Sequence, residues 1–518
     1  MNNTVLAYLS RTEQRFGNKT AIIDRDRTLT FTELDRAAKR LAGVIGKRTG
    51  TIRQPIAVLI PKGMESIVAF LGILFSGNFY VPLDENMPQS RLESILHNLQ
   101  PGCVISSAAY MATLLAINVP AAQIVPVNAA FDELLDINEA DWLERIRQVI
   151  DTDPVYTIYT SGSTGIPKGV VVAHRGVLDY IDWAIERFQI DEQTIIGNQS
   201  PFYFDNSTLD IYLCLATGAT LVIIPKSHFS FPLRLMEYVR EMNINFIFWV
   251  PSVLINVANL KILEKTAPAP LQRIFFAGEV MPNKQLNVWR TCYPQAVFVN
   301  LYGPTEITVD CTYYVVERPF QDHEPLPIGI PCRNTEVLVL NDKDVPVGKG
   351  ESGELCVRGS SLALGYWKDP EKTGRVFAQN PLQNNYPERI YRTGDIVYYN
   401  EQGEIMFLGR KDNQIKHLGH RIELGEIETV AQSLAQVDHA CAVYDRVREE
   451  ITLFYQSGDF LEAAELRRQL AQLLPRYMIP AKVKIMRELP FNANGKVDRT
   501  MLAEACRQTR PEVECCER

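Results

Sequence analysis

The sequence predicts an α/β fold: a large N-terminal domain of mixed α/β subdomains plus a β-rich subdomain, followed by a small mobile α+β C-terminal domain. Three observations lead to this prediction. Up to about residue 303, short apolar strand segments alternate with helical segments, a pattern typical of a largely parallel sheet covered by helices. From about residue 328, short strands follow one another between Gly, Asp and Asn turns. After residue 410 a polar stretch separates a last, mixed region.

The first region shows the alternation clearly. Residues 29–45 end in a helix, in which Leu34, Ala38, Leu41 and Ile45 form one apolar stripe. A buried strand at 56–60 precedes a helix over 66–77, and residues 79–96 predict a strand, a proline-marked loop and a helix. Further strands are expected at 220–225, 246–251, 273–278 and 297–303.

The later elements divide into two groups. Strands at 336–342, 353–359, 395–399 and 404–410 form the β-rich subdomain. The last region has helices at 425–434 and 462–474, strands at 440–445, 451–456 and 482–486, and a final helix after Asn494–Gly495. We therefore expect an N-terminal core over residues 1–411 and a mobile C-terminal domain over 412–518.

Composition excludes several classes of protein. The chain has 518 residues, enough for two or three domains, and its apolar content of 46% supports large packed cores. A net charge of −8 argues against a nucleic-acid-binding protein. The N-terminus lacks the features of a signal peptide, and no run approaches the roughly 20 apolar residues of a membrane span. Ten cysteines without zinc or disulfide spacing indicate reduced thiols, so we expect a cytoplasmic protein with no membrane partner.

The loop YTSGSTGIPKGV, residues 159–170, has the composition of a phosphate-binding loop. It is not a P-loop, because Lys168 lies between Pro167 and Gly169 and no Ser or Thr follows it to hold magnesium. Strands are expected on both sides, at 154–160 and 169–174, so no helix N-terminus is available for an anion. Backbone amides and hydroxyls could instead surround phosphate oxygens. A simple Gly/Ser surface hairpin remains an alternative.

Four more segments carry polar groups suited to a nucleotide. LYGPTEIT places Glu306, a possible magnesium ligand, after a strand. YRTGD ends in Asp395, whose carboxylate could accept both hydroxyls of a ribose. GRKDNQIKHLGHR occupies the predicted domain junction, and NANGKVDR places Lys496 in a turn. Each segment alone could be an ordinary turn, but the ordered set makes coincidence implausible.

With these motifs the chain resembles the adenylate-forming superfamily, specifically the amino-acid adenylation domains of nonribosomal peptide synthesis. The resemblance extends from LTFTELDRAAKRLA to FNANGKVD. It implies an enzyme that uses ATP and Mg²⁺ to convert a carboxylate into an acyl-adenylate and pyrophosphate, and then transfers the acyl group to a thiol. It also implies a role for each matching residue.

The matching nucleotide-binding residues are Ser161, Gly162, Ser163, Thr164, Gly165 and Lys168 in the phosphate loop, Gly278 and Glu279 after Ala277 beside adenine, Tyr302 stacking on adenine, and Asp395 with Arg410 at the ribose. Thr305 and Glu306 match the phosphate and magnesium positions. Asp412 matches the hinge and Lys496 the catalytic lysine.

The resemblance gives Lys496 rather than Lys168 the main chemical role. Attack of a carboxylate on the α-phosphorus concentrates negative charge, which magnesium at Glu306 and the ammonium of Lys496 would offset. Lys168 would mainly handle the departing pyrophosphate. Rotation about Asp412 would then exchange Lys496 for the face around Gly419 in the thiol step.

The same resemblance implies an amino-acid pocket. Asp205 matches the residue that pairs with the substrate's α-amino group, which distinguishes amino-acid enzymes from fatty- and aryl-acid ligases. The pocket would be lined by Asn206, Leu209, Phe248, Phe275, Ala277, Leu301, Val309 and Asp310, with Lys496 near the carboxylate. This mostly apolar lining favours a compact aliphatic amino acid.

Five of these residues, Leu209, Phe248, Ala277, Leu301 and Val309, resemble the pocket of freestanding prolyl-adenylating ligases that load carrier proteins in pyrrole and alkaloid biosynthesis. L-proline is therefore the first expected substrate. Asp310 departs from that apolar pattern, and an acid there accompanies ornithine, lysine or arginine in some family members. A cationic amino acid remains the alternative.

The expected acceptor is the phosphopantetheine thiol of a separate carrier protein, because no carrier segment is recognisable after NGKVDR; coenzyme A is the rival. The motifs are also compatible with an acyl-CoA ligase, a luciferase-like oxidase, a non-adenylating ATP-binding regulatory module and an inactive family member. A metal-binding role for His174, His417 and His420 is disfavoured by their spacing, and we expect them to face solvent or phosphate.

Overall fold

The structure is a computed structural model that describes residues 4–132, 139–162, 167–457, 461–490 and 497–508. The chain forms two compact units. The first comprises Met1–Glu85, Leu96–Tyr159 and Gly169–Lys411, and the second comprises Asn86–Ile95, Thr160–Lys168 and Asp412–Arg518.

A nine-stranded sheet forms one half of the first unit. Its order is β15-β14-β13-β12-β11-β9-β10-β1-β2, and the strands from β13 to β1 pair in parallel. The strands are β1 (Thr20–Asp24), β2 (Arg27–Thr30), β9 (Ile195–Asn198), β10 (Thr220–Ile223), β11 (Phe246–Trp249), β12 (Arg273–Phe276), β13 (Val297–Tyr302), β14 (Thr312–Val315) and β15 (Ile330–Pro331). The carboxyl ends of β11, β12 and β13 therefore meet at one edge, where ligands bind open parallel sheets.

A seven-stranded sheet has the order β18-β8-β7-β4-β3-β5-β6 and is mainly parallel. Its strands are β3 (Pro55–Leu59), β4 (Phe79–Pro82), β5 (Cys103–Ser106), β6 (Ile124–Pro126), β7 (Pro154–Thr160), β8 (Lys168–Ala173) and β18 (Gly365–Tyr366). The predicted phosphate loop connects β7 to β8, so it joins two neighbouring strands as the sequence predicts.

The β-rich part is a five-stranded antiparallel sheet of order β16-β17-β20-β19, with β21 also paired to β20. These strands are β16 (Thr335–Leu340), β17 (Ser352–Gly359), β19 (Phe377–Gln379), β20 (Arg389–Tyr399) and β21 (Ile405–Arg410). Its location after residue 328 agrees with the change in pattern seen in the sequence.

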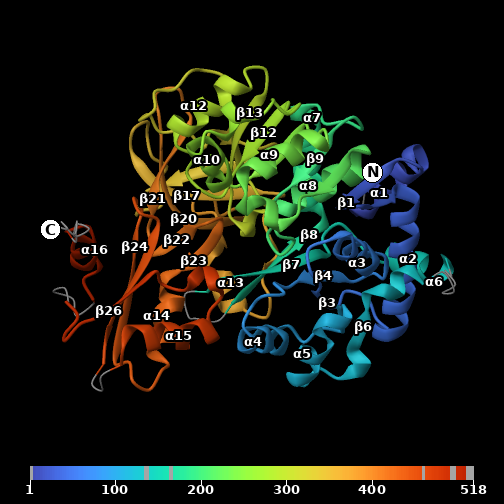
Figure 1. The fold of residues 1–518 in the computed structure, drawn as a ribbon, viewed down its shortest axis with the longest axis horizontal. Helices are drawn as coiled ribbons and strands as arrows, with labels where there is room; N and C mark the ends of the chain where they lie inside the picture. Colours follow the sequence, from blue (N-terminus) through green and yellow to red (C-terminus); the bar gives the residue numbers. More distant parts are fainter. Residues whose placement is uncertain (1–3, 133–138, 163–166, 458–460, 491–496, 509–518) are drawn as a thin grey trace, which may run out of the picture. The chain divides into compact units, whose positions relative to one another are not determined.

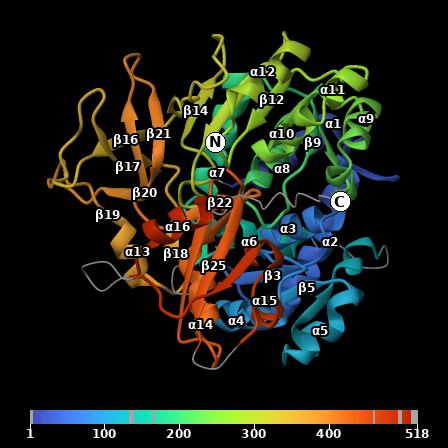
Figure 2. The same ribbon diagram turned by 60° about the vertical axis from the view of Figure 1, so that its left-hand side comes forward.

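The helices up to residue 376 include α1 (Leu6–Phe16), α2 (Phe31–Thr49), α3 (Met64–Phe75), α4 (Gln89–Leu99), α5 (Met111–Ala116), α6 (Glu139–Arg147), α7 (His174–Phe188), α8 (Asn206–Thr217), α9 (Pro232–Glu241), α10 (Pro251–Asn259), α11 (Ile262–Lys265), α12 (Asn283–Cys292) and α13 (Pro370–Val376). Several of them bury apolar faces, such as α2, α3, α7 and α8. Both views show α10 and α12 beside β12 (Figure 1 and Figure 2). The apolar stripe predicted for α2 is fully buried at Leu34, Ala38, Leu41 and Ile45.

Local sequence explains where α2 begins and ends. Thr30 and Glu33 form a capping box, in which each side chain accepts a hydrogen bond from the other residue's backbone amide. Gly50 ends the helix in the left-handed conformation with φ of 67°. These signals fix a 19-residue helix whose length lets it pack along α3.

The second unit contains the hairpin β22 (Gln414–His417) and β23 (His420–Glu423), helix α14 (Leu424–Gln432), the sheet β24 (His439–Asp445), β25 (Glu450–Gln456) and β26 (Lys482–Ile485), and helices α15 (Ala463–Leu473) and α16 (Arg499–Gln508). The hairpin was not predicted, because its strands are polar. Leu418 and Gly419 both have positive φ, 52° and 79°, which matches the tight turn of a two-residue hairpin.

Within the described part of the chain, no helix combines the length and apolar character needed to cross a membrane.

Two helix-interior glycines test the packing of α2 on α3. A Cβ at Gly43 in α2 would meet nothing within 4 Å, whereas a Cβ at Gly72 in α3 would lie 3.0 Å from both Ala38 O and Leu41 Cβ. Gly43→Ala should therefore stabilise the protein by about 0.5–1 kcal/mol through helix propensity alone. Gly72→Ala should destabilise it by about 1–3 kcal/mol, because the two helices must separate.

Urea unfolding followed by tryptophan fluorescence measures both changes. Both variants replace Gly by Ala, so both gain the same helix propensity. The difference between their free energies of unfolding therefore reports how closely the two helices approach each other. Equal shifts of the unfolding midpoint would contradict the packing described here.

Candidate functional site

Tyr302, Asp395 and Arg410 lie together in the first unit. Tyr302 ends β13, while Asp395 and Arg410 are directly opposite each other on β20 and β21. The Tyr302 hydroxyl donates to Asp395 Oδ2, and Arg410 Nη1 lies 2.8 Å from Asp395 Oδ1. Burial and the Asp395 charge raise the pKa of Tyr302 well above its usual value, so the hydroxyl stays protonated. A carboxylate held in this way keeps further lone pairs for hydroxyl donors such as those of a ribose.

The segment after β12 has an open face. Gly278 has φ of 96°, which favours glycine, and a Cβ there would meet only Val250 Cγ1 at 3.9 Å. Glu279 Oε2 accepts a hydrogen bond of 2.9 Å from the amide of Ser252, in the first turn of α10. The hydrogen bond between Ser252 and Glu279 holds the segment in place. The absence of a side chain at Gly278 leaves space for a flat ligand.

Glu306 is fully buried in the short turn Thr305–Ile307. Its Oε1 accepts a hydrogen bond of 2.8 Å from the hydroxyl of Tyr366. Tyr366 belongs to β18, where it pairs with Val170 of β8. Glu306 is therefore tied to the strand that leaves the predicted phosphate loop. Sequence reasoning missed Tyr366, because no local pattern indicates a contact across 60 residues.

A magnesium ion fits the donor set around Glu306. Among the described residues, no group of three or more His, Cys, Asp or Glu side chains could hold a metal ion. Magnesium that arrives with ATP needs only one or two carboxylates, since phosphate oxygens and water complete its shell. Glu306 provides such a carboxylate. The neighbouring Thr305 is 8% exposed.

The described part of the phosphate loop belongs to the second unit. Ser161 is buried, and its Oγ donates a hydrogen bond of 2.7 Å to the carbonyl of Arg421 in β23. Gly162 is buried too. Burial raises the pKa of Glu426, whereas Arg91 and a hydrogen bond with the Gly162 backbone lower it. Lys168 is half-buried at the start of β8. Ser163, Thr164 and Gly165 lie outside the described residues.

Three predicted residues of the amino-acid pocket lie on the neighbouring parallel strands β11, β12 and β13. Phe248 pairs with Phe275 in the register of β11 and β12, and Leu301 lies on the next strand. Asp205 and Asn206 are half-buried at the start of α8. The buried members are Leu209, Phe248, Phe275, Ala277, Leu301, Val309 and Asp310.

A strained turn presents Val309 and Asp310. Thr308 and Val309 have φ of 57° and 72°, a conformation that costs energy for β-branched residues and is common at functional sites. Thr308 Oγ1 donates to the carbonyl of Ser361 at 2.7 Å. A Cβ at Gly303 would lie 2.3 Å from the carbonyl oxygen of Val309, so the turn packs directly on the glycine.

Asp310 has a partner that the sequence did not indicate. Its Oδ2 accepts a hydrogen bond of 2.6 Å from the hydroxyl of Tyr180, which lies on α7. Both residues are buried, Asp310 at 3% and Tyr180 at 5% exposure.

The expectation for His174 is wrong. The residue is buried and its Nδ1 accepts a hydrogen bond from the amide of Val5, and burial lowers its pKa to about 4. It is therefore a neutral core histidine rather than a solvent- or phosphate-facing group. In the second unit His417 contacts the hydroxyl of Tyr444, and the His420 ring stacks on Tyr477 at 3.6 Å.

Lys496 lies outside the described residues. Asp412, the predicted hinge, is exposed at the start of the long segment of the second unit, and its Oδ1 accepts a hydrogen bond of 3.2 Å from the amide of Gln414. Its proposed role stays a prediction.

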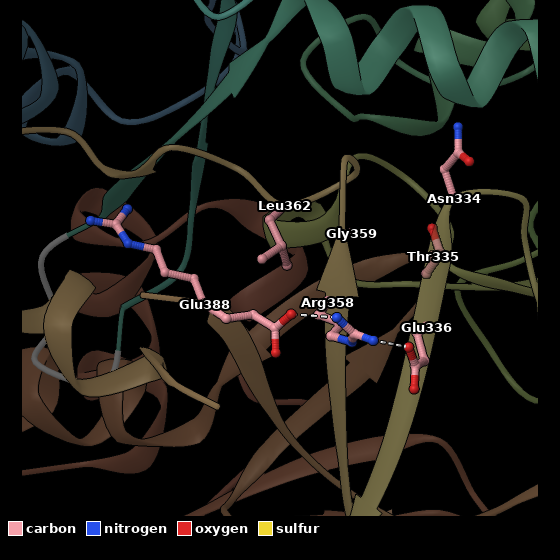
Figure 3. A pocket seen from close by; sticks show the side chains of 8 residues that line it. Asn334, Thr335, Glu336, Arg358, Gly359, Leu362 and Glu388 are labelled. Carbon is pink, nitrogen blue, oxygen red and sulfur yellow. Dashed lines mark hydrogen bonds and ion pairs between the residues drawn. The ribbon is translucent and has the colours of Figure 1, made fainter. Parts of the chain in front are cut away.

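An open hollow of about 550 Å³ lies elsewhere in the first unit, on the five-stranded sheet. Figure 3 shows Arg358 between Glu336 and Glu388, with which it forms two ion pairs. The lining residues are Asn334, Thr335, Glu336, Arg358, Gly359, Leu362, Glu388 and Arg389, and none of them is a predicted site residue. The hollow is therefore distinct from the candidate site.

The fold and the clustered site residues define an adenylate-forming enzyme. Residues 9–367 match the family model described as AMP-binding enzyme, and the chain belongs to this family.

Relatives extend the match over most of the chain. It is 32% identical over 498 residues to L-proline--[L-prolyl-carrier protein] ligase of Pseudomonas fluorescens, covering 94% of this chain and 96% of that protein. It is 33% identical over 509 residues to tyrocidine synthase 3 of Brevibacillus parabrevis, covering 95% of this chain. The chain spans only 7% of that synthase and 44% of tyrocidine synthase 1, so it corresponds to a portion of these larger proteins.

Solved structures share the fold. The Vibrio cholerae adenylation domain AlmE, in complex with glycyl-adenosine-5'-phosphate, has a TM-score of 0.82 at 23% identity and covers 98% of both chains. A nonribosomal peptide synthetase protein with adenylation and PCP domains has a TM-score of 0.81 at 23% identity, covering 97% of this chain and 84% of that one.

The strained turn generates a prediction. Gly303→Ala would place a Cβ 2.5 Å from the Cα of Asp310, which must displace the turn that carries the pocket residues. Since a displacement of about 1 Å can cost about a hundredfold in rate, kcat/KM for amino-acid-dependent pyrophosphate exchange should fall by about that factor. Gly374→Ala is the control, because a Cβ there meets nothing within 4 Å. Unchanged exchange in Gly303→Ala would show that the turn does not position the pocket.

Proposed function

We propose that this protein activates an amino acid with ATP, forming an aminoacyl-adenylate and releasing pyrophosphate. The observation that carries the proposal is the location of Asp205 at the start of α8, in the segment that leaves the carboxyl end of β9, the parallel neighbour of β11. Asp205 is half-buried, and its carboxylate is chemically suited to bind the α-ammonium group of an amino acid. Leu301 of the pocket and Tyr302 of the nucleotide side both lie at the carboxyl end of β13, so the two ligands would bind at the end of the same strand.

In this mechanism a substrate carboxylate oxygen attacks the α-phosphorus of ATP. A new oxygen–phosphorus bond forms, the bond to the β-phosphate oxygen breaks, and pyrophosphate leaves with that electron pair. Asp205 holds the ammonium group and so aims the carboxylate. Asp395, fixed by Tyr302 and Arg410, orients the ribose. Such positioning supplies much of the rate of phosphoryl-type transfers.

Magnesium and two lysines would act on the phosphates. Magnesium held by Glu306 would neutralise phosphate charge when bound. Lys496 would donate to the oxygens on which negative charge develops, while Ser161, Gly162, Ser163, Thr164, Gly165 and Lys168 would surround the departing phosphates. Gly278, Glu279 and Tyr302 would flank the adenine.

L-proline is the proposed substrate. The lining of Leu209, Phe248, Ala277, Leu301 and Val309 is apolar and buried, which suits a compact side chain. The relative from Pseudomonas fluorescens is named as a ligase of L-proline and a prolyl-carrier protein, which supports proline over other amino acids. The cationic alternative, ornithine, is favoured by one observation, the buried carboxylate of Asp310.

The proposed acceptor is the phosphopantetheine thiol of a discrete carrier protein, supplied in trans, in natural-product biosynthesis. The names of the prolyl ligase and of the structure with a PCP domain support a carrier rather than coenzyme A. For this second step we propose that residues 412–518 form a mobile domain that rotates about Asp412. Because the reaction consumes ATP, we expect it to take place in the cytoplasm.

A panel of amino acids in ATP–pyrophosphate exchange tests the function. We expect magnesium-dependent exchange with L-proline that is at least about tenfold faster than with ornithine or leucine, because an apolar pocket of fixed size rejects both extra charge and extra volume. Chelation of magnesium should abolish the signal. Exchange with ornithine but not proline would reject proline, and no exchange with any amino acid or acyl acid would reject adenylation.

Lys496→Ala tests the assignment of the chemical step. Exchange should fall by about a hundredfold or more with little change in the Kd for ATP, because the lost interaction acts on charge that develops in the transition state. Lys168→Ala should cause a smaller loss. Lys482→Ala is the control, since it removes only an exposed ion pair with Glu450. Normal exchange in Lys496→Ala, or an equally deep loss in Lys168→Ala, would contradict the assignment.

A further inference from the structure

Asp310 is an unexpected residue in its surroundings. Its neighbours in the proposed pocket, Val309 and Leu301, are apolar and equally buried. A buried carboxylate is costly unless hydrogen bonds or a cation stabilise its charge. The group that stabilises the charge of Asp310 therefore determines which substrate side chain the pocket can accept.

Tyr180 supplies one such partner from outside the pocket lining. Its hydroxyl donates to Asp310 Oδ2 at 2.6 Å, the length of a hydrogen bond to a charged acceptor. Burial raises the pKa of Tyr180 well above its usual value, and the charges of both Asp310 and Asp205 raise it further. The hydroxyl therefore stays protonated and lies within the electrostatic influence of both acidic residues proposed to face the amino acid.

The rest of α7 holds Tyr180 in place. One turn earlier, Gly176 packs so closely on the strained turn that a Cβ there would lie 2.6 Å from Thr308 Oγ1. On the other side, the Tyr180 ring stacks on Trp183 with centroids 5.8 Å apart. Trp183 contacts Phe188, which packs against Phe275 of the pocket at 4.6 Å. The hydroxyl is thus fixed relative to the turn that carries Asp310.

We propose that Tyr180 is a positioning residue that acts through Asp310 to set the charge preference of the amino-acid pocket. By donating to Oδ2, Tyr180 stabilises the carboxylate and reduces its demand for a cation, so that an uncharged side chain can bind beside it. With one donor fewer, Asp310 would favour a substrate side chain that carries a positive charge. This inference rests on the proposed function and adds a residue that determines specificity.

Ornithine and norvaline form the probe pair, because they have the same chain length and differ mainly by the terminal ammonium group. For the wild type, Tyr180→Phe, Asp310→Asn and the double variant, the ornithine-to-norvaline ratio is measured as kcat/KM in pyrophosphate exchange. The ornithine-to-norvaline ratio of the association constants, 1/Kd, is measured by calorimetry without ATP, so both ratios rise when ornithine is favoured. Proline is measured alongside.

Tyr180→Phe should raise the ornithine-to-norvaline ratio by about tenfold or more, the effect of losing a hydrogen bond to a charged group. Asp310→Asn should lower the ratio relative to the wild type. In the Asp310→Asn background Tyr180→Phe should leave the ratio unchanged, because the hydroxyl acts only through the carboxylate.

Tyr8→Phe is a matched control. The Tyr8 hydroxyl also donates at 2.6 Å to a carboxylate, that of Asp182 on the same helix α7, and Tyr8 is equally buried. Its loss should leave the ratio unchanged. Tyr180→Phe overturns the inference if it weakens both amino acids equally, or if it shifts the ratio by the same factor in the Asp310→Asn background.

The two readouts separate this inference from the proposed function. A wild type that binds both amino acids but catalyses no exchange would reject adenylation, while the Kd ratios still test Tyr180. A wild type that prefers ornithine would reject only the assignment of proline as substrate. Tyr180→Phe should still raise the ornithine-to-norvaline ratio in that case. A wild type that binds proline but neither probe overturns this inference alone, and a wild type that binds no amino acid overturns both.

Discussion

Three buried carboxylates of the proposed site each accept a hydrogen bond from a tyrosine hydroxyl on a different element. Tyr302 donates to Asp395, Tyr366 to Glu306 and Tyr180 to Asp310. A carboxylate can be buried only if donors offset the loss of hydration, and a phenol supplies one donor without adding a second full charge. The proposed site can therefore hold buried carboxylates for a ribose, a magnesium ion and an amino-acid side chain while the protein stays folded.

These hydrogen bonds also link the sheets of the first unit. Tyr366 joins the seven-stranded sheet to the turn at Glu306, and Tyr302 joins the nine-stranded sheet to Asp395 of the five-stranded sheet. The turn at Thr308 and Val309 lies between these contacts and holds a strained conformation. Strain of this kind persists where the surroundings over-determine the backbone, and here Gly303, Gly176 and the carbonyl of Ser361 do so.

The sequence predicted the regular elements well where their pattern is local. The stripe of α2, the strands at the core of the parallel sheets and the shift to antiparallel strands after residue 328 all follow from apolar periodicity and turn residues. The hairpin β22–β23 was missed because each strand has only one apolar residue, Ile415 or Ile422, among polar ones. His174 was misjudged because the amide that it contacts belongs to Val5, 169 residues away.

Linear order along the chain was enough to predict the class of fold, the strand–loop–strand setting of residues 159–170, and the order of motifs that identifies the family. These features depend on spacing between residues, so a single sequence contains them. The donors that satisfy the buried carboxylates became known only from the folded arrangement. Tyr180 and Tyr366 lie 130 and 60 residues from their partners, and nothing in their local sequence distinguishes them from core tyrosines. A buried carboxylate needs a hydrogen-bond donor. The packing of α7 and β18 determines that Tyr180 and Tyr366 are the donors.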